Sequence, residues 1–173
     1  LVVLFMLFYA HGPEVAGVIE GISGFTVPRP WFAWILLGSL GVFSVLLYLN
    51  YYWNQFVRYA LREFLLLGLF FVVFHTASLL WAFAIYFVVW HSIPSLADQM
   101  RLLYGNLSVK SGIRYVKASA VYWVGALITL AGAFLFFRDS DYGYLPLFFS
   151  FLAAITFPHV LVITRLYRER GDL

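Results

Sequence analysis

The stretch FLLLGLFFVVFHTASLLWAFAIYFVVWH, residues 64–91, decides the fold because it is apolar almost without a break. About 20 apolar residues cross the hydrocarbon core of a bilayer, so these residues and the amphipathic segment before them are too long for one ordinary span. The only polar interruption is His75–Thr76–Ala77–Ser78. We therefore predict a tight turn there, between one helix over residues 55–74 and another over residues 78–100. A single long helix is the alternative.

The rest of the chain continues this pattern. Residues 11–30 are rich in Gly and Pro and predict a loop that contains a short interfacial helix over residues 13–22. Residues 106–117 predict a basic, polar loop. Four further apolar stretches predict the other spans, the first of them truncated: residues 1–10, 31–52, 115–137 and 144–167. The sequence thus predicts an all-α integral membrane protein with about six transmembrane helices, forming one polytopic domain that lacks an N-terminal portion.

Composition supports a membrane protein and excludes several functions. Hydrophobic residues make up 64% of the chain and charged residues only 11%, whereas a soluble domain carries roughly a quarter charged residues. The net charge of +3 is spread thinly among hydrophobic spans, which argues against nucleic-acid binding. The absence of cysteine excludes disulfides and iron–sulfur ligation by this chain. No phosphate-binding loop, HExxH or Gly-x-Ser-x-Gly motif occurs.

Basic residues fall unevenly on the predicted loops. Only Arg29 and Arg138 lie in the loops of one side. The loops of the other side carry nine basic residues, namely Arg58, Arg62, Arg101, Lys110, Arg114, Lys117, Arg165, Arg168 and Arg170. Because cytoplasmic loops are enriched in Lys and Arg, this asymmetry predicts a cytoplasmic C-terminus and favours two helices around His75.

Two histidines are predicted to lie at the same depth of the membrane. At 1.5 Å per residue, His91 and His159 are both about 20 Å from the external surface. A histidine facing lipid is costly, so both are expected to face the interior, where imidazole nitrogens suit iron, copper or zinc. The alternative is a pair of core histidines hydrogen-bonded to Ser92 or Thr156. Ser95 stands four residues after His91, so no helix supplies a local histidine pair.

Further residues are candidates for supporting roles. Glu63 is a candidate carboxylate for orienting a metal-bound histidine, or an interfacial partner of Arg62 or Arg58. Asp98 is predicted to reach the membrane surface near Arg101. Four aromatic side chains are predicted to line a tunnel for a long apolar ligand, with packing or lipid contact as the alternative: Phe74, Phe83, Tyr86 and Phe87.

Two segments carry a family resemblance. Residues 81–92, WAFAIYFVVWHS, resemble the "FalYFxxWHS" helix of the Brp/Blh family of membrane β-carotene cleavage dioxygenases. Residues 153–159, AAITFPH, are similar to the "aaLTxPH" segment of that family. Residues 11–17 resemble its "HPeeva" loop, and residues 62–66 its "E-lll" helix. The four segments occur in the family's order.

The resemblance implies a bacterial inner-membrane enzyme that splits β-carotene at its central double bond into two retinal molecules, using Fe(II) held by histidines. His91 matches the first histidine of the family's HSxxH motif, and His159 matches the histidine of its PH motif. Ser95 replaces the second histidine of HSxxH and is therefore expected beside the metal rather than on it. The family's N-terminal histidine motifs are not in this sequence.

Two functions follow from these patterns. One is a carotenoid-cleaving dioxygenase whose remaining ligands come from an N-terminal part. The other is a non-catalytic relative that binds carotenoid or packs within a larger pigment–protein or electron-transfer complex, a role suggested by Ser95. A transporter or scaffold of unrelated function is a third reading, although the spans offer little polar lining for a substrate pathway.

Overall fold

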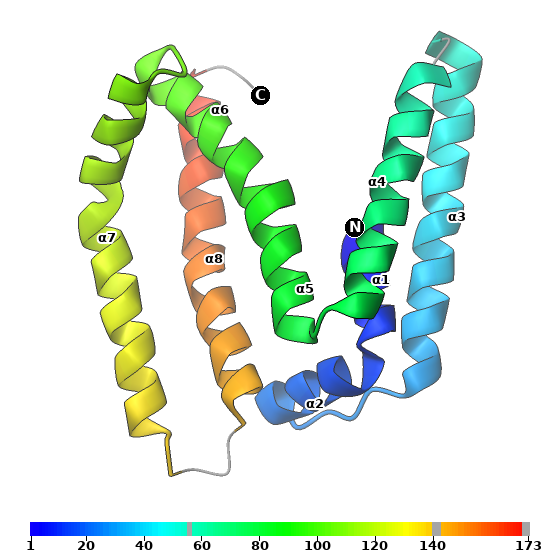
Figure 1. Ribbon diagram of the computed structural model, residues 1–173, viewed down its shortest axis with the longest axis horizontal. Helices are drawn as coiled ribbons and strands as arrows, with labels where there is room; N and C mark the ends of the chain where they lie inside the picture. Colours follow the sequence, from blue (N-terminus) through cyan, green and yellow to red (C-terminus); the bar gives the residue numbers. More distant parts are fainter. Residues whose placement is uncertain (55–56, 140–142, 171–173) are drawn as a thin grey trace. The chain divides into compact units, whose positions relative to one another are not determined.

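The computed structural model describes residues 1–54, 57–139 and 143–170, with side chains described except at 50–60, 163, 166, 167, 169 and 170. Every secondary-structure element in these ranges is helical. The elements are α1 Val2–Ala10, α2 Gly12–Ser23, α3 Arg29–Asn54, α4 Val57–Thr76, α5 Leu79–Ile85, the π-helix η1 Tyr86–Ser92, α6 Ile93–Tyr104, α7 Val109–Phe136 and α8 Tyr144–Arg170 (Figure 1).

The predicted turn after His75 is confirmed. Helix α4 ends at Thr76 and α5 begins at Leu79, so the alternative of one long helix is wrong. The Nδ1–H of His75 donates to the carbonyl of Phe71 at 2.8 Å, and the hydroxyl of Thr76 donates to the carbonyl of Val72 at 2.9 Å. Both polar side chains thereby bond within their own helix, one turn back from its end.

Four helical segments are long and apolar enough to cross a membrane, or up to five if the bent pair of α1 and α2, at 98° to each other, forms one broken span. The four are Arg29–Leu49, Leu79–Tyr104, Val109–Phe136 and Tyr144–Val162. Helix α4 occupies the place of another predicted span, but its first side chains lie outside the described residues. The described residues are thus all-helical, with at least four helices long and apolar enough to span a membrane, while six spans remain a prediction.

The predicted loop over residues 106–117 is wrong for most of its length, because α7 begins at Val109. Gly105 ends α6 with φ of +77°, a left-handed conformation that favours glycine. The backbone N–H of Ser111 donates to the Ser108 hydroxyl oxygen at 3.2 Å, which caps the new helix. Polarity here reflects helix capping, which residue composition alone does not distinguish from a loop.

The π-helix η1 was not predicted from the sequence. Its wider turns are seen where the N–H of Ile93 donates to the carbonyl of Val88, five residues earlier. Pro94 follows within the first turn of α6. In an α-helix the proline ring would clash with the carbonyl of Trp90, and that carbonyl would lack a donor. The wider turns before Pro94 relieve this conflict without ending the helix.

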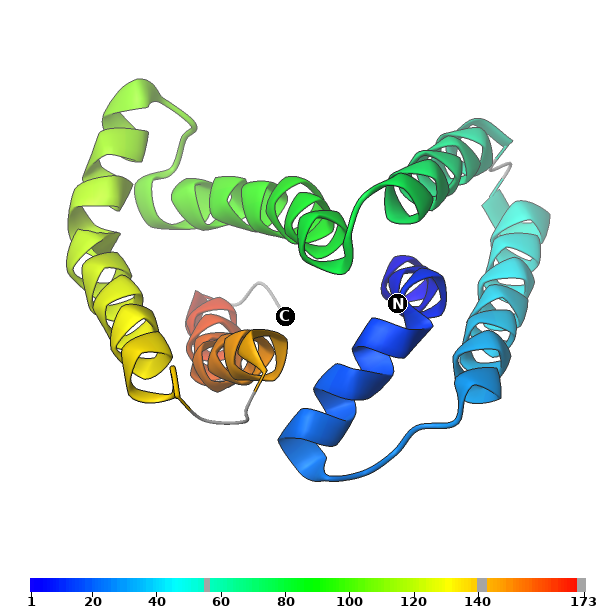
Figure 2. The same cartoon turned by 60° about the horizontal axis from the view of Figure 1, so that its bottom comes forward.

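The chain forms two compact units. Unit 1 comprises Leu1–Ala16 and Val27–Tyr115. In it α1 lies beside α3 and α4 (Figures 1 and 2), and the buried apolar side chains of these helices and α5 form a small core. Leu7 of α1 and Ala82 of α5 are 0% exposed, and Phe74 of α4 is 1% exposed.

Unit 2 comprises Gly17–Thr26 and Val116–Leu173. Here the end of α2 meets the start of α8, where a Cβ placed on Gly21 would lie 2.6 Å from the Pro146 ring. A glycine is therefore required for this close approach. Beside it lies a cavity of about 240 Å³ lined by Gly21, Ile22, Phe137, Pro146, Leu147 and Ser150. None of the predicted tunnel residues lines this cavity.

Replacing Leu7 by Ala is expected to lower the free energy of unfolding by about 2–5 kcal/mol, because a fully buried side chain leaves a cavity. Thermal or denaturant unfolding of the purified protein in detergent measures the change. Leu69→Ala is the matched control, since Leu69 is 59% exposed. Its cost should stay within about 0.5 kcal/mol. Equal losses for the two variants would show that α1 does not build the core of unit 1.

Candidate functional site

The candidate site in unit 1 is built around His91, which lies in η1 with its side chain exposed. One row of side chains at four-residue spacing leads to it. The rings of Phe83 and Phe87 are stacked at 5.4 Å between centroids, and the rings of Phe87 and His91 are also 5.4 Å apart. Both phenylalanines are half-buried. The histidine thus ends an aromatic row along the helix.

The neighbouring face of the same helix packs on α4. Phe70 is 4% exposed and makes edge-on ring contacts with Tyr86, at 6.0 Å, and Trp90, at 5.6 Å. Phe74 packs against Phe70 at 5.5 Å. The four predicted tunnel residues therefore divide into two groups. Tyr86 contributes to packing between α4 and η1, and Phe74 is buried beside Phe70 on α4. Phe83 and Phe87 form the row that leads to His91.

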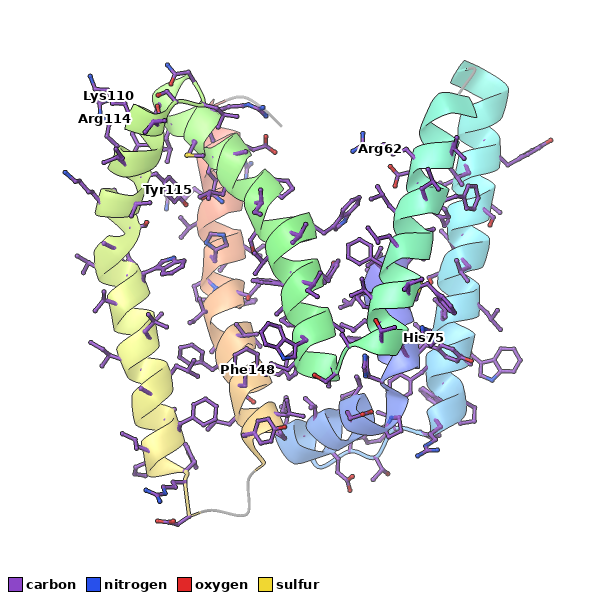
Figure 3. All side chains as sticks on the ribbon, viewed as in Figure 1. Arg62, His75, Lys110, Arg114, Tyr115 and Phe148 are labelled. Carbon is purple, nitrogen blue, oxygen red and sulfur yellow. The ribbon has the colours of Figure 1, made fainter. Side chains whose placement is uncertain are left out.

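A chain of hydrogen bonds begins one helical turn after His91. The amide Nε2 of Gln99 donates to the Ser95 hydroxyl oxygen at 3.0 Å, and the Tyr115 hydroxyl donates to Oε1 of Gln99 at 2.7 Å. Gln99 is only 7% exposed, so both ends of a buried amide are satisfied. Figure 3 labels Tyr115 on α7. The polar side chains of α6 and α7 thereby fix Ser95, a link that spacing in the sequence did not indicate.

His159 lies in unit 2, in α8, directly after Pro158. The missing N–H of the proline removes one helical hydrogen bond at this point. The side chain of His159 is exposed, and the Thr156 hydroxyl donates to the carbonyl of Leu152 at 2.7 Å. The alternative of buried histidines bonded to Ser92 or Thr156 gains no support, because His91 is exposed as well.

The two remaining predicted residues are carboxylates, Asp98 on α6 and Glu63 on α4. Asp98 accepts a hydrogen bond from Arg101 at 3.1 Å on the exposed side of α6, so it lies near Arg101 as predicted, and its place at the membrane surface stays a prediction. Glu63 is half-buried on α4, and no ion pair between it and Arg62 is seen in the described residues. The side chain of Arg58 lies outside the described residues, so that predicted pairing is not tested. The role of Glu63 stays a prediction.

His11 is a polar residue whose environment the sequence did not reveal. It lies at the bend between α1 and α2, is 7% exposed, and its Nε2 has no hydrogen-bond partner within the described residues. A buried nitrogen left unpaired costs about 1–3 kcal/mol, so a water or another group is expected to bond it. Its neighbour Gly12 approaches the Phe32 ring, where an added Cβ would lie at 3.5 Å.

Comparison with known families tests the resemblance that the four segments carry. A family model described as beta-carotene 15,15'-dioxygenase matches residues 1–167, which is nearly the whole chain. The chain belongs to the β-carotene 15,15'-dioxygenase family. No curated protein and no solved structure matched the chain. The resemblance to the Brp/Blh family is thereby confirmed, and the segments containing His91 and His159 both lie inside the match.

The family implies an iron, and the residues present fit it only in part. Both histidines offer the right kind of donor, since imidazole binds iron well. Within the described residues, however, no group of three or more His, Asp or Glu side chains is close enough to hold a metal ion. The position that carries a second histidine in the family's HSxxH pattern is Ser95, already bonded to Gln99. The described residues alone therefore do not make a complete iron site.

Replacing Tyr115 by Phe is expected to lower the free energy of unfolding by about 1–3 kcal/mol, because Oε1 of the buried Gln99 loses its donor. Tyr122→Phe is the control on the same helix, since Tyr122 is 78% exposed. Unfolding of both variants in detergent should separate them by at least about 1 kcal/mol. Indistinguishable curves would mean that the Tyr115 bond contributes nothing to holding α6 against α7.

Proposed function

We propose that this chain belongs to a membrane enzyme that splits β-carotene into two retinal molecules, with His91 and His159 supplying two ligands of a non-haem Fe(II). The observation that carries the proposal is the family match over residues 1–167, which includes both histidines. The reaction balances with O₂ as the oxidant, because each oxygen atom ends in one aldehyde. The iron supplies O₂ activation in such oxygenases.

The residues around His91 suit a conjugated polyene. The stacked rings of Phe83 and Phe87 are half-buried in unit 1 and offer an apolar, aromatic lining to a long ligand. Aromatic faces bind extended π-systems by offset stacking, and they exclude water from the bound chain. A substrate lying along this row would bring its double bonds toward the imidazole of His91. These residues would bind and orient the polyene.

A non-catalytic carotenoid-binding relative is the second candidate. It is favoured by one observation, the Ser95–Gln99 hydrogen bond at the position where the family pattern has a histidine. Such a subunit would retain the aromatic row and lose the metal, and would work within a larger pigment–protein or electron-transfer complex. Iron content of the purified protein distinguishes the candidates, since stoichiometric iron contradicts this one.

The proposed setting is the bacterial inner membrane with a cytoplasmic C-terminus. The nine basic residues on one set of predicted loops support this orientation. Several long apolar helices support the membrane location itself. A reporter enzyme that is active only in the periplasm, fused to the C-terminus, should therefore be inactive, and activity there would reverse the orientation.

Replacing His91 by Ala is expected to reduce retinal to background in bacteria that accumulate β-carotene and express the complete reading frame. The measurement is retinal by chromatography, normalised to protein level. His75→Ala is the matched control, because His75 bonds to the backbone of its own helix at the end of α4 (Figure 3) and should leave the yield unchanged. Wild-type retinal yield from His91→Ala would refute the assignment of His91 as a ligand.

Replacing Ser95 by His tests the second candidate directly. If Ser95 is the reason for lost activity, Ser95→His should raise both bound iron and retinal yield above those of the wild type. Iron is measured by elemental analysis of the purified protein, and retinal by chromatography. Ser119→His, a control on α7, should change neither. If the wild type already forms retinal and Ser95→His does not improve it, Ser95 is a tolerated replacement and the non-catalytic candidate fails.

A further inference from the structure

We propose that Ser95 and the aromatic row before it form a binding site for a polyene aldehyde, with the polyene along Phe83 and Phe87 and the carbonyl oxygen accepting a hydrogen bond from the Ser95 hydroxyl. The ligand class rests on the proposed function, whose product is such an aldehyde. The site itself rests on the row and on the hydroxyl.

The π-helix keeps the row straight. Four residues in an α-helix overshoot a full turn by about 40°, so side chains at four-residue spacing drift around the helix. A π-helix has more residues per turn, and the same step there falls short of a full turn. Because η1 lies between Phe83 and Ser95, the two drifts oppose each other. The equal spacing of 5.4 Å along Phe83, Phe87 and His91 agrees with this alignment.

The hydroxyl of Ser95 is oriented as a donor. A serine oxygen has one proton and two lone pairs. One lone pair accepts from Nε2 of Gln99, and the Gln99 amide is held in turn by Tyr115. Within the described residues, no acceptor bonds the Ser95 proton. The hydroxyl of the half-buried Ser95 is thereby left as a fixed donor for a ligand.

A polyene aldehyde is apolar along its chain and polar at one end, and the row followed by Ser95 changes from apolar to polar in the same way. From Phe83 to Ser95 the helix rises on the order of 18 Å. The first part offers aromatic faces, and the last part offers a hydroxyl one turn beyond His91. A hydrocarbon carotenoid has no oxygen to meet this donor, whereas an aldehyde oxygen is a good acceptor in an apolar site. The site therefore discriminates between the substrate and the product of the proposed reaction.

The test measures binding of two added ligands to the purified, metal-free full chain in detergent: all-trans-retinal and β-carotene. Quenching of tryptophan fluorescence reports affinity, since Trp90 lies in η1. We expect Ser95→Ala to weaken retinal binding about 3- to 10-fold, the loss of one hydrogen bond. Binding of β-carotene should not change. Ser95→Thr keeps the hydroxyl and should keep the affinity for retinal.

Ser44→Ala is the control for loss of a helical serine, because the Ser44 hydroxyl bonds to the carbonyl of Leu40 in its own helix. It should affect neither ligand. Equal weakening of both ligands by Ser95→Ala, or no weakening of either, would overturn the proposal.

A second measurement needs no variant. A hydrogen bond to the carbonyl lowers its stretching frequency, so the C=O band of retinal bound to the wild type should lie below that of retinal in detergent alone. An unshifted band contradicts the proposal.

The proposed function and the proposed aldehyde site can fail separately. If the protein forms retinal but binds it equally well without Ser95, the function stands and the site is refuted. If the protein binds retinal through Ser95 but forms none, the site stands and the proposed function is refuted.

Discussion

The structure depends on one constraint, that the hydrocarbon core of a bilayer offers no water to backbone N–H and C=O groups. Every spanning segment must bond its own backbone, and helices do this. The constraint accounts for the π-helix before Pro94 and for the side-chain bonds at the end of α4. Pro94 removes one donor, and the wider turns of η1 accommodate it. At the end of α4, the side chains of His75 and Thr76 bond to carbonyls one turn back in their own helix.

The same constraint governs the buried polar side chains. Gln99 is buried on α6, and its amide is satisfied at both ends, by Ser95 and by Tyr115 from the next helix. A bond between residues 16 positions apart ties two helices together where hydrophobic burial gives little preference for one helix neighbour over lipid. His11 is the exception within the described residues, since its Nε2 is buried without a partner. Ser95 thus belongs both to the proposed site and to the hydrogen bonds that join α6 to α7.

The sequence predicted the helices well because hydropathy and breakers act locally. The turn after His75 and the short helix beginning near Pro13 were visible in the pattern of polar residues and glycines. The start of α7 was missed because serines that cap a helix look like loop residues. The difference between an α- and a π-helix lies in which carbonyl each N–H reaches, and apolar periodicity does not record it. Pro94 was the available signal.

The site was predicted less completely for a different reason. Motifs indicated the family, which the match over residues 1–167 confirmed, and they singled out His91 and His159, whose role as ligands stays a prediction. Aromatic residues at helical spacing did not reveal which faces pack on a neighbour, so Phe74 and Phe83 received the same interpretation although only Phe74 is fully buried. The Gln99–Tyr115 bond depends on how two helices meet across Gly105, which no local pattern specifies.

The π-helix also gives this span a tolerance of chain length that a regular α-helix lacks. A π turn accommodates an extra residue within an otherwise α-helical segment. Deleting one residue between Tyr86 and Ser92 would let the helix return to α geometry, and the residues after it would keep nearly the same direction relative to α5. In a segment that is α-helical throughout, the same deletion would rotate everything after it by about 100°. A one-residue deletion in η1 would therefore leave Gln99 facing Tyr115, whereas one in α6 before Gln99 would turn it away.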